Sequence, residues 1–180
     1  MRQQALAGGA AIAGAVAFIV IVAGLQAAQS AYDPSEQLMS ELALGPHGRF
    51  MLGAFVALTV ALAALALGLP ARQRWARAAL LVSALCFLAA GIFPLGAATE
   101  AHVSAVALGF VSAGLAMYLL PAAPPFQGAR WRIASWGLLA VMGAAAALAH
   151  SALPIGLGQR LAAAALLGWL GLCGGRLLRR

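Results

Sequence analysis

The run FMLGAFVALTVALAALALGL, residues 50–69, decides the fold of this chain. It holds no charged side chain, and about 20 apolar residues in one helix can cross a hydrocarbon layer of about 30 Å. Pro70 follows the run directly, at a place where a proline ends a helix without harm. Arg72 and Arg74 come next. The stretch therefore predicts a transmembrane helix that ends beside a basic loop.

Five further apolar runs flank this one along the chain. They cover residues 5–28, 78–95, 103–120, 133–149 and 161–177. The first run is longer than the 7 to 15 apolar residues, roughly, of a signal peptide, so we expect it to be retained. The pattern predicts an all-α membrane protein, a single domain over residues 1–180 built as a six-transmembrane-helix bundle.

The composition indicates the same class of protein. Of the 180 residues, 64% are hydrophobic and only 8% are charged, whereas soluble domains carry about 25% charged residues. Most of the surface must therefore face lipid, and we expect membrane lipid as a partner. The net charge of +7 comes from arginines that lie beside the apolar runs. They form no exposed basic stripe, so we expect no nucleic-acid partner.

The arginines also predict the orientation. If the N-terminus is cytoplasmic, only Arg49 and Arg160 lie outside. Short cytoplasmic loops are enriched in arginine, so this bias predicts that both termini are cytoplasmic. The arginines then placed inside are Arg2, Arg72, Arg74, Arg77, Arg130, Arg132, Arg176, Arg179 and Arg180.

The longest outer loop, residues 29–49, carries the signals of a short helix. Asp33 suits the N-cap, Pro34 suits the first helical position, and Glu36 follows three residues after Asp33. Gly45 and Pro46 form a stop signal. We expect an interfacial helix over residues 34–44, with Leu38 and Leu42 buried and Glu36 exposed.

Acidic and histidine side chains gather on the predicted outer face. Acidic residues contribute little to membrane orientation, so the positive-inside bias does not explain this placement. The longer first loop explains part of it, and the remainder indicates a polar cavity open to the outside. The residues concerned are Asp33, Glu36, Glu41, Glu100, His47, His102 and His150.

Three residues at helix mouths are candidates for one polar cluster. Glu41 precedes the second apolar run, His102 opens the fourth, and Arg160 opens the last. A partly buried arginine needs a carboxylate partner, which Glu41, Glu100 or Asp33 could supply. The other interpretations are an arginine that reaches lipid headgroups and a network that only ties loops together. Further candidate binding residues are Ser40, His47, Glu100 and His150.

The chain resembles the bacterial and archaeal membrane proteins grouped as domain of unknown function 998. The resemblance rests on residues 40–46 (SELALGP), on residues 91–94 (GIFP) with His102, and on residues 156–160 (GLGQR) with Trp169. It covers nearly the whole chain and implies a six-helix bundle with its recurrent polar residues on one side, but no settled activity. From it we expect a multi-pass protein of the bacterial inner membrane.

Three classes of function stay open at this point. The first is binding or transfer of a lipid or lipophilic small molecule at the outer polar cavity. The second is an intramembrane enzyme on such a substrate, with Glu41 or Asp33 as acid or base, His102 as its partner and Arg160 holding an anionic group. The third is a transporter or a structural subunit. No cofactor is predicted; zinc on three histidines or haem between two is the alternative.

Overall fold

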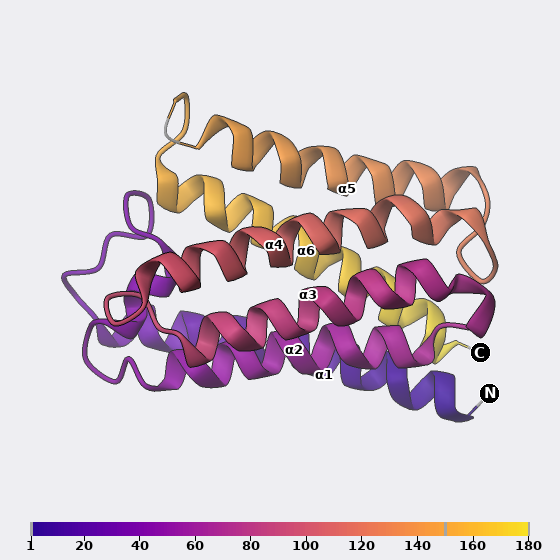
Figure 1. Cartoon of the computed structure of the whole chain (residues 1–180), viewed down its shortest axis with the longest axis horizontal. Helices are drawn as coiled ribbons and strands as arrows, with labels where there is room; N and C mark the ends of the chain where they lie inside the picture. The colour runs from indigo at the N-terminus through magenta and orange to yellow at the C-terminus, as the bar shows by residue number, and fades with distance from the viewer. Residues whose placement is uncertain (1, 150, 180) are drawn as a thin grey trace.

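The computed structural model describes residues 2–149 and 151–179 as a bundle of long helices (Figure 1). Within these residues six helices are long and apolar enough to cross a membrane. The predicted six-helix membrane fold is therefore confirmed. The helices are α1 (Arg2–Ala28), α2 (Phe50–Gly68), α3 (Arg74–Ile92), α4 (Thr99–Leu119), α5 (Ala129–Leu148) and α6 (Ile155–Leu178), with short 3-10 helices η1 (Met39–Ala43), η2 (Ala71–Gln73) and η3 (Leu120–Ala122).

Four of the six helices begin four or more residues earlier than their apolar runs predict. They start at Arg74, Thr99, Ala129 and Ile155, where the runs predict starts at residues 78, 103, 133 and 161. An apolar run marks the part of a helix that lies in hydrocarbon. The backbone can continue its hydrogen bonding through polar residues in the headgroup region, so the helix extends beyond the run. In consequence His102 and Arg160 lie within helices.

Both termini lie at the same end of the bundle (Figure 1). We call this the terminal end. The opposite end, with loops 29–49 and 93–98 and residues 151–154, we call the distal end. Helices that follow one another in the chain pack together from α1 to α4, and α6 packs against α1 and α5. Contact between α4 and α5 is sparse. The bundle is thus a ring with one weak seam, between α4 and α5.

Small residues let neighbouring helices approach closely. A Cβ added to Gly8 in α1 would lie 2.9 Å from the Leu177 Cβ in α6. In α4, a Cβ on Gly109 would lie 3.2 Å from the Phe87 ring of α3. Both glycines are buried. Side chains larger than hydrogen at these positions would push the helices apart.

Serine hydroxyls join helices inside the bundle. Ser83 of α3 donates to the Gly109 carbonyl of α4 at 2.8 Å. Ser135 of α5 donates to the Met117 carbonyl of α4 at 2.6 Å and accepts the indole N–H of Trp169 of α6 at 2.7 Å. In lipid such bonds are worth about 1–2 kcal/mol at most. The second chain of bonds joins α5 to α4 across the weak seam, and to α6.

The helix expected over residues 34–44 is shorter than predicted. Residues 34–36 form a turn, and only Met39–Ala43 is helical, as a 3-10 helix. The Asp33 carboxylate accepts two hydrogen bonds from Ser35 instead of capping a longer helix. The Ser35 carbonyl accepts the Leu157 N–H, and the Gln37 carbonyl accepts Arg160 and the Tyr32 hydroxyl. These two oxygens therefore take no part in a continuous helix.

The predicted burial of this loop holds in part. Leu42 is fully buried and Glu36 is exposed, as expected. Leu38, by contrast, is only half-buried, because the short helix begins after it. Met39 is buried in its place. The loop therefore rests on the bundle through residues 39 and 42.

Candidate functional site

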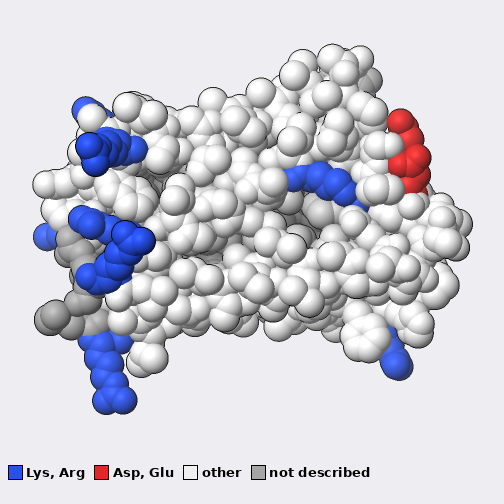
Figure 2. Space-filling model, turned by 180° about the vertical axis from the view of Figure 1, so that it is seen from behind, with Lys and Arg blue, Asp and Glu red and all other residues white. Residues whose placement is uncertain are grey.

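The two ends of the bundle differ in charge (Figure 2). Acidic side chains appear only at the distal end of the face shown, and most of the basic ones lie at the terminal end. The four acids of the chain belong to the distal loops and the first turn of α4. The predicted grouping of acids on one side is thus present.

Arg160 anchors a hydrogen-bonded network at the distal end. Its guanidinium donates to the Tyr32 hydroxyl at 2.6 Å, and to the carbonyls of Gln37 at 3.1 Å and Gly156 at 3.2 Å. The side-chain amide of Gln37 in turn donates to Glu41 at 3.2 Å, and the Glu41 carboxylate also accepts the backbone N–H that opens η1. Gln37 therefore lies between the arginine and the carboxylate.

This network corrects the expectation that Arg160 binds a carboxylate directly. Its described hydrogen bonds end on two backbone carbonyls and a phenol, all of them neutral. Asp33 and Glu41 act through space on the Tyr32 phenol, and the Arg160 charge acts through space on the Asp33 carboxyl group. Burial raises the pKa of Tyr32 above its ordinary value, against the opposing effect of the Arg160 guanidinium. Tyr32 therefore stays protonated at neutral pH and donates to the Leu38 carbonyl at 3.0 Å.

His102 has its own set of contacts, at the mouths of α3 and α4. Its Nδ1 lies 2.8 Å from the Ala90 carbonyl and 3.0 Å from the Phe93 carbonyl. Carbonyls only accept, so Nδ1 carries the proton. The ring meets Phe55 edge to face at 5.6 Å. His102 is 2% exposed and holds the end of α3, while its Nε2 is buried without a described partner. None of these partners of His102 belongs to the network of Arg160 and Glu41. The hydrogen bonds therefore do not join His102 to the other two residues of the expected cluster.

Three of the other expected site residues lie at the surface. Asp33 is exposed, and the hydrogen bonds from the Ser35 hydroxyl and backbone lower the pKa of its carboxyl group. His47 is exposed, in a left-handed turn with φ of 61°. Glu100 is exposed in the first turn of α4, where the helix dipole favours an acid. His150 lies outside the described residues.

The described part of the chain contains no cluster of side chains suited to bind a metal ion. Within residues 2–149 and 151–179, no three His, Cys, Asp or Glu side chains come together closely enough to hold a metal ion. The two cysteines, Cys86 and Cys173, are free thiols.

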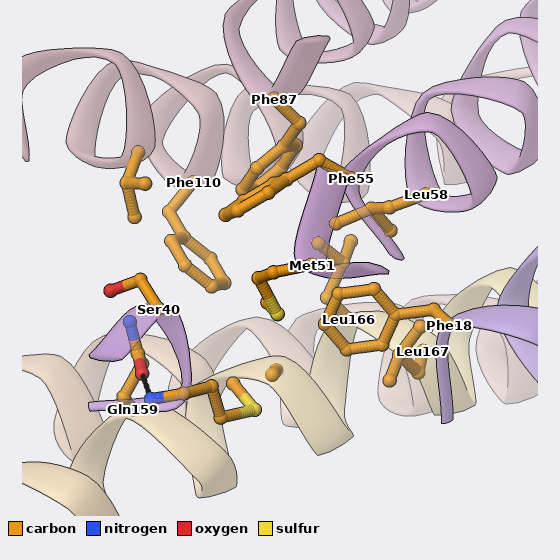
Figure 3. Close-up of a pocket in the computed structure, with 13 residues that line it drawn as sticks. Phe18, Ser40, Met51, Phe55, Leu58, Phe87, Phe110, Gln159, Leu166 and Leu167 are labelled. Carbon is orange, nitrogen blue, oxygen red and sulfur yellow. Dashed lines mark hydrogen bonds between the residues drawn. The ribbon is translucent and has the colours of Figure 1, made fainter. Parts of the chain in front are cut away.

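Ser40 and Gln159 bring polar atoms to a small internal cavity (Figure 3). The cavity has a volume of about 30 Å³, which is enough to hold a water molecule. The Gln159 carbonyl accepts the Met39 N–H at 2.6 Å. Within the described residues, no hydrogen bond is seen for the Gln159 amide NH₂ or the Ser40 hydroxyl. Figure 3 shows both at one end of the cavity, with Phe55, Phe87 and Phe110 around the rest.

A larger cleft opens beside this cavity, along the weak seam between α4 and α5. Its volume is about 560 Å³. Val106, Phe110 and Gln159 border both spaces, so they form the partition between cavity and cleft. The lining is apolar apart from Gln159 and Tyr118 among the described residues. The cleft faces the region where lipid would surround the bundle.

Sequence reasoning misses the neutral residues that shape this site. Tyr32, Gln37 and Gln159 supply the network and the cavity, whereas the expectations concentrated on ionisable groups. The available signal was the position of Gln159 inside the GLGQR stretch, beside Arg160. Gly156 in the same stretch allows the loop to pack closely against α6, because a Cβ at this position would lie 2.6 Å from the Ser35 carbonyl oxygen.

Fold and site together define a multi-pass helical membrane protein with a polar distal end and a lateral apolar cleft. The family described as "Protein of unknown function (DUF998)" matches residues 11–175, and the chain belongs to this family. No curated protein and no solved structure matches the chain.

Proposed function

We propose that the protein binds an elongated lipophilic molecule in the cleft between α4 and α5, as a multi-pass protein of the bacterial inner membrane. The observation that carries the proposal is the cleft itself. Its volume of about 560 Å³ falls within the range of roughly 300–1,000 Å³ usual for small-molecule sites. The scarcity of contacts between α4 and α5 gives the molecule a lateral path from the bilayer.

The shape of the cleft favours a long, thin ligand. Along α4 the lining runs from Val106 to Tyr118, a helical rise of about 18 Å. The walls between these residues are aliphatic and aromatic, with Leu139 and Met142 facing them from α5. Such walls stabilise hydrocarbon by contact and offer no partner to a charged group. A neutral chain or ring system suits them.

Gln159 gives the cleft a polar end. Its carbonyl is already occupied by the Met39 N–H, while its NH₂ group has no described partner. A carbonyl, ether or hydroxyl oxygen of the ligand would satisfy this donor, which is costly to leave unpaired in an apolar setting. We therefore infer a ligand with one hydrogen-bond-accepting group at its distal end.

Two glycines of α5 allow a matched test. Gly143 lines the cleft, whereas Gly137 does not, and a Cβ added at either meets no atom within 4 Å. Gly143→Leu should fill the cleft without disturbing packing, and Gly137→Leu adds the same side chain to the same helix elsewhere. The probe is a long-chain alcohol that carries a diazirine, cross-linked by light to the purified full chain.

The expected result is strong labelling of the wild type and Gly137→Leu, with labelling of Gly143→Leu reduced several-fold. Excess unlabelled alcohol should suppress the signal, because a site saturates and bulk partitioning into detergent does not. Equal labelling of the two leucine variants would contradict the proposal.

A further inference from the structure

A second groove runs along the opposite side of α6, between α6 and α1. Its volume is about 430 Å³. Gly168 and Gly171 of α6 form part of its floor, and a Cβ added at either meets no atom within 4 Å. Figure 2 shows this face of the bundle, hollowed beside basic side-chain atoms. The residues that give the groove its polar distal end are Gln26 and Arg160.

The length of the groove matches one leaflet of a bilayer. From Arg160 to Gly171 the α6 axis rises by about 16 Å, and half of a hydrocarbon layer of about 30 Å is about 15 Å. Apart from Gln26 and Arg160, the described lining is apolar. An acyl chain placed in the groove would therefore start beside the guanidinium and end near the bilayer centre.

The Arg160 guanidinium has donors to spare. Of its five N–H groups, three serve Tyr32, Gln37 and Gly156. The Nε–H and one Nη2–H are left without a described partner. Since the three partners are neutral, no bonded carboxylate neutralises the positive charge. A half-buried cation with free donors favours an oxyanion, which accepts charge-assisted hydrogen bonds.

The nearby acids leave this position open to an anion. Asp33 and Glu41 are the acids that influence the neighbouring Tyr32. Both belong to loop 29–49, and their carboxylates accept hydrogen bonds from Ser35 and from Gln37, respectively. Neither lines the groove. The groove thus presents an arginine and a glutamine to the headgroup, and apolar residues to the chain.

We propose that the groove between α1 and α6 is a binding site for an anionic phospholipid, with the phosphate on Arg160 and one acyl chain along Gly168 and Gly171. This site is separate from the cleft between α4 and α5, and its ligand carries a charge that the cleft does not accommodate. Arg160 and Gln159 are neighbours in the chain, but they serve the two different sides of α6.

Native mass spectrometry of the full chain in detergent tests this site. The probes are phosphatidylglycerol and phosphatidylcholine with identical acyl chains. Gly168→Leu fills the groove and leaves the Arg160 contacts in place, and Gly137→Leu is its control on α5. Arg160→Ala removes the charge. Glycerol phosphate, added in excess, distinguishes recognition of a free phosphate from recognition of a whole lipid.

We expect the wild type and Gly137→Leu to bind one phosphatidylglycerol at least about tenfold more tightly than phosphatidylcholine, as a charge-assisted bond implies. Gly168→Leu and Arg160→Ala should lose this preference, and glycerol phosphate should not displace the lipid. Equal affinity for both lipids, undiminished binding by Gly168→Leu, or displacement by glycerol phosphate would each overturn the proposal. Should Arg160→Ala fail to fold, Gly168→Leu decides alone.

Discussion

Replacement of Gly156 by alanine should loosen the distal site. Gly156 lies in the first turn of α6 against the turn at residues 34–37, and an added Cβ would lie 2.6 Å from the Ser35 carbonyl oxygen and 2.7 Å from that of Pro34. These are backbone atoms, so the overlap is relieved only if the loop moves. Two hydrogen bonds join the loop to α6 here, from Leu157 N–H to the Ser35 carbonyl at 2.9 Å and from Arg160 to the Gln37 carbonyl at 3.1 Å.

The magnitude follows from these contacts. Moving the loop breaks two hydrogen bonds worth about 1 kcal/mol each, and leaving it in place incurs overpacking strain of about 1–3 kcal/mol. Either way the cost is about 2 kcal/mol. Alanine also gains up to about 1 kcal/mol over glycine in a helix. Gly137→Ala meets open space and shows that gain without the clash. The two variants should therefore differ by about 2 kcal/mol.

The assay is unfolding of purified protein in mixed micelles of mild detergent and dodecyl sulfate, followed by circular dichroism. Limited proteolysis reports on loop 29–49 separately. Gly156→Ala should unfold at a lower dodecyl sulfate fraction than Gly137→Ala, and its loop should be cleaved faster. If both variants unfold together and the loop is equally resistant, the close contact between α6 and the loop does not exist.

Three further predictions test other parts of the structure. Ser135→Ala should lower the free energy of unfolding by about 1–2 kcal/mol, because the buried Trp169 indole N–H loses its acceptor; Ser104→Ala, exposed on α4, should change it little, and equal stabilities would contradict the network. In a Tyr118→Phe background, the absorbance titration of Tyr32 should have its midpoint above the usual pKa of about 10. The stability that the protonated hydroxyl contributes is complete below the usual pKa and is lost as the pH rises through the higher folded-state pKa. A midpoint below about 10 would refute the burial of the phenol. In a cysteine-free background in intact cells, Glu36→Cys should react with an impermeant thiol reagent and Arg74→Cys should not; the opposite pattern would reverse the predicted orientation.

The fold could be predicted because lipid imposes a simple rule. Every span needs about 20 apolar residues and internal backbone hydrogen bonding, and both demands are visible in runs such as residues 50–69. Helix ends could not be placed this way, since α6 begins at Ile155, ahead of its apolar run. Apolarity reports the surrounding solvent, whereas the helix end depends on local hydrogen bonds.

The site was harder to predict than the fold. Arg160 was identified from its position against the charge bias, but its partners are carbonyls and a phenol. Such acceptors exist in every stretch of chain and leave no pattern in the sequence. The short helix was likewise predicted to be too long. Tyr32 and Arg160 bind backbone carbonyls that would accept hydrogen bonds within the helix if it covered all of residues 34–44. Contacts between distant segments decided the first case, and hydrogen bonds from outside the predicted helix decided the second.

Mapping the photo-cross-linked residues is the most direct test of ligand binding in the cleft between α4 and α5. The full chain is labelled with the diazirine-bearing long-chain alcohol, digested, and sequenced by tandem mass spectrometry. If the alcohol binds in the cleft, the adducts should concentrate on residues 106–118 and 139–146, the stretches of α4 and α5 that line the cleft. Excess unlabelled alcohol should suppress these adducts. Adducts spread evenly over the lipid-facing surfaces of all six helices, and insensitive to the competitor, would contradict it.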